Sequence, residues 1–479
     1  MSAQPAEKKP IAIPYRRAPG WVYTFENGHT LVFVPKPGDV FNVSTWARTG
    51  SIHETDETTG ISHFLEHLLF KGTARFGPGE FDRRMESMGA VINAATWKDF
   101  TFYYVTGPKG DDDRNFLTAL DLHADMMTQA LLPEEEIGQP FDPDAPPEAQ
   151  ETGDKRERGV VIEEIGMRGD QPWTKLFNAV NQRMYPPGHP YRRDVIGTRR
   201  NIGLVPRQTL VDYYRRWYAP GNLITIIVGD LDPDTLCERA QKVFCFETAS
   251  TARALTLADV PLNAPPPAAA PDVVKGQYNT AFFLMAAHGP TPQALEETVA
   301  LDVLSYALGE GHSSRMNQNL IEKAAVPLFN FLSCGQSTLK LGNTFYIQGN
   351  VAPQEGEDDD AAMTRALEQV RAEVAALLGD RPLSQTELTR AVKALKADFA
   401  ETSETASGIA ESIGESLTVS DGLDYYLGYL QALEGLTLER ARDCARRYLA
   451  PERFYIATLL GEDGEPQDGS APQEAVARC

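Results

Sequence analysis

Few cysteines, no long apolar run and a shortage of basic residues set the first limits on this chain of 479 residues. Its five cysteines are widely spaced and form no CxxC pair, so we expect neither a disulfide framework nor a cysteine-ligated metal. No apolar run approaches the ~20 residues that cross a bilayer. Lysine and arginine number 45 against 67 aspartate and glutamate, a net charge of −22. Nucleic acid and anionic membrane surfaces are therefore not expected as partners, because both require a basic face.

Targeting and nucleotide-binding signals are also missing. Residues 1–17 are polar and rich in proline, without the apolar stretch of a signal peptide. We therefore expect a cytoplasmic protein, or a periplasmic one if the numbering is that of a processed chain. No glycine-rich phosphate loop precedes a helix in Rossmann or P-loop spacing, which argues against a nucleotide-binding fold.

The chain contains an internal repeat. Residues 215–220 read RRWYAP, and residues 446–451, about 230 positions later, read RRYLAP. An apolar, β-rich run ending in glycine and an acidic residue follows each copy. The separation is close to half of the chain, so we predict two similar halves. Strands and helices are segregated within each half, which favours an α+β sandwich with an antiparallel-rich sheet packed against helices.

The predicted boundaries follow from this repeat and from composition. We assign residues 18–247 to an N-terminal α+β domain and residues 273–465 to a homologous C-terminal one. Residues 248–272, rich in proline and alanine, are predicted to be an extended linker, and residues 466–479 a flexible tail. Residues 133–154 are acidic and dense in proline, and we expect a surface insertion without regular helix.

The sharpest chemical signal is HFLEH at residues 63–67. The pattern predicts a helix over 61–70, on which His63 and His67 share one face and can bind one metal ion. Glu66 lies beside them without having to be a ligand. This HxxEH order is the inverse of the HExxH zinc motif. The pentapeptide alone leaves open a pair of hydrogen-bonded surface histidines.

A catalytic zinc ion needs a third protein ligand and an open position for water. A second predicted helix, over 156–168, carries candidate carboxylates for this position. Glu157 and Glu164 are two helical turns apart and so lie on one face. Glu163 competes as the third ligand, and we prefer Glu164 because only it lies two turns from Glu157.

Three segments resemble the pitrilysin/insulinase family of zinc metallopeptidases, in the branch typified by mitochondrial processing peptidase. Residues 60–73 are similar to the inverzincin helix of that family, and residues 156–164 to the helix that supplies its third ligand. Residues 87–96 resemble its substrate-binding edge strand. The resemblance implies a zinc metalloendopeptidase that forms one half of a clam-shell chamber and cleaves peptides or unfolded polypeptides.

The resemblance also implies a role for each site residue. It implies that Zn²⁺ is bound by His63, His67 and Glu164, that Glu66 is the general base, and that Glu157 supports the site. Substrate would pair with the edge strand as an added strand, held by Asn93, Ala94, Ala95 and Thr96.

The second half carries no copy of the zinc motif, since residues 294–298 contain no histidine. Family members with a substrate-gripping pair read Arg-Glu-x-x-Gly-Leu-Ala-Tyr, whereas residues 321–328 here read IEKAAVPL. Both the Arg and the Tyr are missing. The resemblance therefore implies a heterodimer whose second subunit supplies that pair. A homodimer and a non-catalytic structural subunit are the alternatives.

Overall fold

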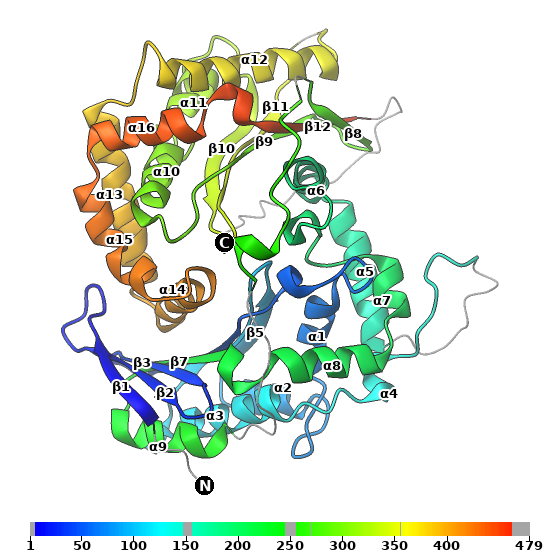
Figure 1. The fold of residues 1–479 in the computed structure, drawn as a ribbon, viewed down its shortest axis with the longest axis vertical. Helices are drawn as coiled ribbons and strands as arrows, with labels where there is room; N and C mark the ends of the chain where they lie inside the picture. Colours follow the sequence, from blue (N-terminus) through cyan, green and yellow to red (C-terminus); the bar gives the residue numbers. More distant parts are fainter. Residues whose placement is uncertain (1–4, 147–155, 245–254, 269, 355, 462–479) are drawn as a thin grey trace.

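The computed structural model describes residues 5–146, 156–244, 255–268, 270–354 and 356–461. Two halves, each built on one β-sheet, lie one above the other (Figure 1). The predicted linker and the predicted insertion lie partly outside the described residues, and the predicted tail lies wholly outside them.

The first half contains a seven-stranded sheet in the order β1-β2-β3-β7-β4-β6-β5. Its strands are β1 (Pro5–Ile11), β2 (Gly20–Phe25), β3 (Thr30–Pro35), β4 (Val40–Ala47), β5 (Val91–Thr96), β6 (Thr101–Pro108) and β7 (Leu223–Gly229). β3 and β7 are parallel, and the other neighbours are antiparallel. β1 and β5 are the two edges. The sequence did not reveal β1, because it contains two prolines, which sheets tolerate only at an edge.

The second half contains a five-stranded sheet in the order β10-β11-β9-β12-β8. Its strands are β8 (Asp272–Gly276), β9 (Phe282–His288), β10 (Phe329–Ser337), β11 (Thr344–Val351) and β12 (Tyr455–Gly461). They take the places of β3, β4, β5, β6 and β7 in chain order, and the single parallel pair, β12 with β8, corresponds to β7 with β3. The predicted α+β class with two similar halves is confirmed.

Helices fill the connections between the strands. The first half carries α1 (Ile61–Leu69), α2 (Glu80–Ser87), α3 (Arg114–Thr128), α4 (Glu134–Ile137), α5 (Arg156–Gly169), α6 (Pro172–Met184), α7 (Arg199–Leu204), α8 (Arg207–Trp217) and α9 (Pro233–Val243). The second carries α10 (Leu295–Leu308), α11 (Arg315–Asn317), α12 (Asp359–Leu378), α13 (Gln385–Thr402), α14 (Ala406–Val419), α15 (Asp424–Gly435) and α16 (Leu438–Tyr448). Throughout the described part of the chain, no helix is both long enough and apolar enough to span a membrane.

One helix of each half packs on the sheet of the other half. α14 packs on β4 and β7, and α6 packs on β12 and β9 (Figure 1). Gly414 of α14 leaves no room for a side chain, since a Cβ there would lie 2.0 Å from Cε2 of the buried Trp46 ring. Two apolar clusters shared between the halves result, so neither sheet is buried on both faces by its own half alone.

The local structure differs from the sequence pattern at two points. The insertion contains one helical turn, α4, which begins directly after Pro133. The sequence pattern of residues 384–417 is typical of one long helix, but the structure forms two helices there, α13 and α14, and Thr405 caps α14 by accepting the N–H of Gly408. The break redirects the chain, so that α14 reaches the sheet of the first half.

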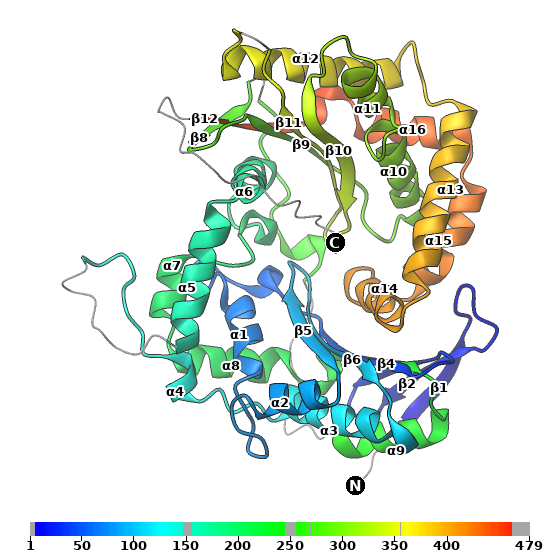
Figure 2. The same cartoon turned by 180° about the vertical axis from the view of Figure 1, so that it is seen from behind.

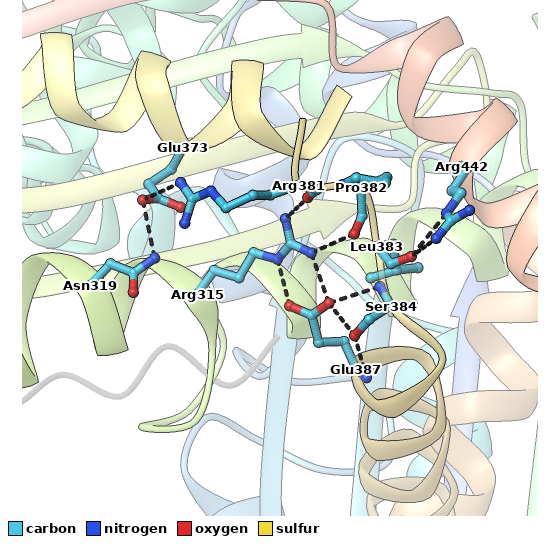
Figure 3. Close-up of polar contacts among 9 residues, drawn as sticks. All are labelled: Arg315, Asn319, Glu373, Arg381, Pro382, Leu383, Ser384, Glu387 and Arg442. Carbon is cyan, nitrogen blue, oxygen red and sulfur yellow. Dashed lines mark hydrogen bonds and ion pairs between the residues drawn. The ribbon is translucent and has the colours of Figure 1, made fainter. Parts of the chain in front are cut away.

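Ion pairs and hydrogen bonds connect α11, α12 and α13 where these helices meet in the second half (Figure 3). Both carboxylate oxygens of Glu387 accept hydrogen bonds from Arg315, at 2.5 and 2.7 Å. Glu387 also caps α13 in a reciprocal box with Ser384. Arg442 donates two hydrogen bonds, of 2.9 and 2.6 Å, to the carbonyl oxygen of Leu383.

Candidate metal and catalytic centre

The HxxEH motif lies on α1, and a carboxylate from the preceding loop holds the first turn of that helix. Gly60 precedes the helix with φ 93° and offers no side-chain cap. Instead, Glu54 accepts the backbone N–H of Gly60 at 2.8 Å and that of Ser62 at 2.9 Å. A Cβ at Gly60 would lie 2.6 Å from the carbonyl oxygen of Ile196, so this position requires glycine. Glu54 therefore fixes where the helix begins, one turn before His63.

Two imidazoles from α1 and a carboxylate from α5 converge beside this helix. Nε2 of His63 lies 3.6 Å from Oε2 of Glu164, and Nε2 of His67 lies 3.5 Å from the same oxygen. One ligand atom from each of the three residues lies within 4.8 Å of the other two. Glu163, the alternative ligand, is exposed and does not belong to this group.

The spacing suits a zinc ion. Ligands about 2.0–2.1 Å from a tetrahedral zinc ion lie roughly 3.3–3.4 Å from one another. The two nitrogen–oxygen separations in the structure, 3.6 and 3.5 Å, are within a few tenths of an ångström of that value. Two imidazoles and one carboxylate also leave a fourth position for water, which is the donor set of a catalytic zinc site.

A second layer of contacts orients these ligands. Oε2 of Glu157 lies 3.3 Å from Nδ1 of His67, and its Oε1 lies 2.6 Å from Nζ of Lys71. Nε of Arg168 donates to Oε1 of Glu164 at 2.9 Å. The sequence signals singled out neither Lys71 nor Arg168, although each lies four residues after a predicted site residue, which is the spacing of a helical neighbour.

The charges of the three candidate ligands affect one another's pKa values. Burial and the neighbouring His67 lower the pKa of His63 to about 4. Burial opposes the charging of His67, but hydrogen bonds to Glu157 and Glu164 outweigh it and raise the pKa of His67 to about 9. The hydrogen bond from His67 lowers the pKa of Glu164 to about 2.

The edge strand β5 lies directly beside α1 (Figure 2). Oγ1 of Thr96, the last residue of the strand, donates to Oε2 of Glu66 at 2.5 Å. Burial raises the pKa of Glu66, and this hydrogen bond opposes the effect. Thr96, predicted from the sequence only as a substrate-binding residue, is thus also a contact of the predicted base.

The other predicted substrate-binding residues follow the alternation of a strand. Asn93 and Ala95 are exposed, and Ala94 is half-buried. Oδ1 of Asn93 accepts the backbone N–H of Ala94 at 2.9 Å. Among the residues that the structure describes, β5 pairs with β6 alone, so its other edge has backbone groups available for another strand.

An arginine on α5 completes the surroundings of the centre. Arg158 has no exposed surface, and its guanidinium lies 5.4 Å from the centroid of the Phe64 ring on α1. Burial lowers the pKa of Arg158 to about 10, so it stays charged at neutral pH. The sequence placed it beside Glu157 but gave no sign that it is buried.

Comparisons with known proteins identify the family. Residues 32–175 match the insulinase family, peptidase family M16, and residues 205–395 match the peptidase M16 inactive domain. The two matches together cover more than half of the chain. The first match lies within the first half, and the second begins near the end of the first half and continues into the second. The chain belongs to the M16, or insulinase, family of peptidases. The match of the second half to an inactive domain agrees with the lack of a zinc motif there.

Curated relatives include zinc proteases and a mitochondrial-processing peptidase. Zinc protease PqqE of Helicobacter pylori is 28% identical over 83% of this chain and 83% of its own length. The beta subunit of the mitochondrial-processing peptidase of Lentinula edodes is 24% identical over 92% of this chain and 90% of its own. The uncharacterized zinc protease YmxG of Bacillus subtilis is 30% identical over 46% of this chain, and the match spans about half, 49%, of YmxG.

Solved structures show the same fold. A protease from Helicobacter pylori superimposes with a TM-score of 0.78 at 25% identity, over 92% of this chain and 99% of that one. A peptidase M16 inactive domain from Pseudomonas fluorescens superimposes with a TM-score of 0.77 at 18% identity, over 95% and 100% of the two chains. The second likeness is one of fold alone.

Proposed function

We propose that this chain is a zinc-dependent endopeptidase subunit whose centre is formed by His63, His67 and Glu164. The observation that carries this proposal is the convergence of both Nε2 atoms on one oxygen of Glu164, at 3.6 and 3.5 Å. Relatives named as zinc proteases support the choice of metal. When bound, zinc supplies a water of lowered pKa and polarises the peptide carbonyl group.

Glu66 is the general base in this proposal. Its Oε2 is engaged by Thr96, so we assign proton transfer to Oε1. The carboxylate accepts a proton from the attacking water and returns it to the leaving amine, and its buried position beside the ligands suits both steps. Glu157 orients the imidazole of His67 and keeps Nε2 directed at the metal position.

Substrate is held as an added strand on the open edge of β5. Backbone pairing accepts many side chains, so we expect broad specificity toward extended or unfolded peptides. The small side chains of Ala94 and Ala95 let a peptide backbone approach this edge, and Thr96 places the end of the strand beside the base.

We further propose that the active form is a pair of subunits. Residues 321–328 lack the Arg and Tyr that resemblance to the family leads us to expect in a complete chamber. In the structure these residues are the end of a short π-helical turn and the loop before β10, and they provide neither side chain. A partner carrying the pair would complete the chamber, and the isolated chain would then be weakly active or inactive. A homodimer and a non-catalytic structural subunit remain the competing assignments.

The test uses the full chain, first alone and then in the complex purified from its source. Bound zinc is measured by elemental analysis, and cleavage is followed with a quenched fluorescent peptide, with and without a chelator. We expect about one zinc ion per chain, chelator-sensitive cleavage in the complex, and loss of cleavage with retained zinc in Glu66→Gln. A chain that binds no zinc is a structural subunit. Full activity of the isolated chain would instead refute the heterodimer, and its size in solution would then identify a homodimer.

The cellular location stays a prediction from the sequence. We propose the cytoplasm, with the periplasm as the alternative for a processed chain, and fractionation of the source cells distinguishes the two.

A further inference from the structure

Arg158 occupies a position on α5 where packing alone would call for an apolar residue. The buried face of α5 consists of Arg158, Val161 and Ile162. Burying a cation costs several kcal/mol unless its donors are satisfied, so an arginine with no exposed surface requires a specific set of partners. Among the described residues no carboxylate forms an ion pair with it.

Its partners are backbone carbonyl oxygens at the ends of two short helices. Nε donates to Gly138, the residue after α4, at 3.2 Å. The two terminal nitrogens donate to the last residues of α7 and the residue after it: to Ile202, to Gly203 at 3.3 Å and to Val205 at 2.9 Å. Carbonyl groups at a helix C-terminus have no partner within the helix and carry partial negative charge, so they compensate the buried cation.

The same guanidinium also contacts the helix that carries the two histidines. It lies over the ring of Phe64, which follows His63 on α1. Arg158 itself immediately follows Glu157 and precedes Glu164 by six residues on α5. The side chain of Arg158 therefore connects α5 to α1 and to the ends of α4 and α7. The relative placement of these elements decides whether the ligands meet.

A directional contact matters here because apolar packing tolerates small rotations of a helix, whereas a metal centre must be held within about 0.5 Å. The planar guanidinium has five N–H donors in a fixed arrangement, so it binds these carbonyl groups in only one orientation of α5. We propose that Arg158 is a positioning residue of the metal centre, which sets the rotation of α5 at which Glu157 and Glu164 face the two histidines of α1.

This proposal rests on the proposed zinc site, so the wild-type chain is measured first. Zinc affinity is determined by competition with a chromogenic chelator, and the geometry of the site is followed by the visible absorption of the Co²⁺-substituted chain. A wild-type chain that binds neither ion refutes the proposed function itself. A wild-type chain that binds both makes the following comparison decisive for Arg158 alone.

The variants are Arg158→Met, which keeps length and apolar volume, and Arg158→Lys, which keeps the charge but not the planar set of donors. We expect Arg158→Met to raise the zinc dissociation constant about 10–100-fold, the usual effect of losing an outer contact of a metal site, and to alter the Co²⁺ spectrum. In the active complex kcat should fall while KM changes by less than about twofold. Arg158→Lys should recover part of the zinc affinity.

Arg442→Met is the matched control, because Arg442 also donates to a backbone carbonyl but lies in the second half (Figure 3). It should leave the zinc affinity and the Co²⁺ spectrum unchanged. Should Arg158→Met fail to fold, Arg158→Lys decides, and a zinc dissociation constant raised severalfold supports the proposal. Wild-type zinc affinity and Co²⁺ spectrum in the folded Arg158 variants, with only a lower unfolding midpoint, would overturn it.

Discussion

The hydroxyl group of Thr96 donates a hydrogen bond of 2.5 Å to Oε2 of Glu66, and this bond links the edge strand of the first sheet to the helix that carries both histidines. In the proposed mechanism this bond places the substrate-binding edge and the base in one fixed relationship. A peptide paired with β5 would reach the end of the strand where the carboxylate lies.

Replacing Thr96 by Val removes this hydrogen bond and keeps the shape of the side chain. A hydrogen bond to a charged group contributes about 1.5–3 kcal/mol, so we expect kcat to fall roughly tenfold or more, with zinc content unchanged. Thr96→Ser keeps the hydroxyl and should retain most of the activity. Steady-state kinetics on the quenched peptide measure both variants, and a fully active Thr96→Val would contradict the role given to this bond.

Replacing Glu157 by Gln removes the negative charge that faces both His67 and Lys71. We expect the zinc dissociation constant to rise about 10–100-fold, because His67 loses the partner that orients it. Glu163→Gln is the control, since Glu163 is exposed on the same helix and lies outside the ligand group. Competition with a chelator measures both, and equal losses in the two variants would refute a specific role for Glu157.

Acid should lower the free energy of unfolding of the second half, because Glu387 becomes protonated. Burial acts to raise its pKa, but hydrogen bonds from Arg315 and Ser384 outweigh burial and lower that pKa to about 2. Because the folded-state pKa lies below the ordinary value of 4.5, this contribution to stability is complete above pH 4.5 and is lost as the pH falls toward 2. Urea unfolding should therefore show that the stability difference between wild type and Glu387→Gln narrows by roughly 1 kcal/mol between pH 7 and pH 3.5. A difference that does not change with pH would contradict the assignment.

The packing of α14 on the sheet of the first half is tested by a substitution at Gly414. A Cβ at this position would overlap the ring of Trp46, so Gly414→Ala should lower the free energy of unfolding by about 1–3 kcal/mol, the usual cost of overpacking. Gly435→Ala, at the end of α15, is the control because no atom of the described residues lies within 4 Å of its Cβ position. Urea unfolding measures both, and equal stabilities would show that α14 does not pack tightly on the first sheet.

Much of the first half could be predicted because its signals are local. The HxxEH spacing on one helical face and the two-turn spacing of Glu157 and Glu164 need only the geometry of a helix. The break between α13 and α14 could not be predicted from periodicity, because Thr405 and the residues before it are compatible with a continuing helix until α14 must reach the other sheet. β1 was missed for a similar reason, since its prolines are allowed only because the tertiary structure places it at an edge.

The sequence by itself determined the donor types, their order and the repeat of about 230 residues, because helix and strand periodicities are properties of neighbouring residues. His67 and Glu164 are 97 positions apart in the sequence. Only the tertiary structure decided that Nε2 of His67 lies 3.5 Å from Oε2 of Glu164. It alone decided that Thr96 touches Glu66 and that Arg158 lies buried against Phe64. Such contacts depend on how whole helices and strands pack, and that packing depends on the buried surfaces of both halves together.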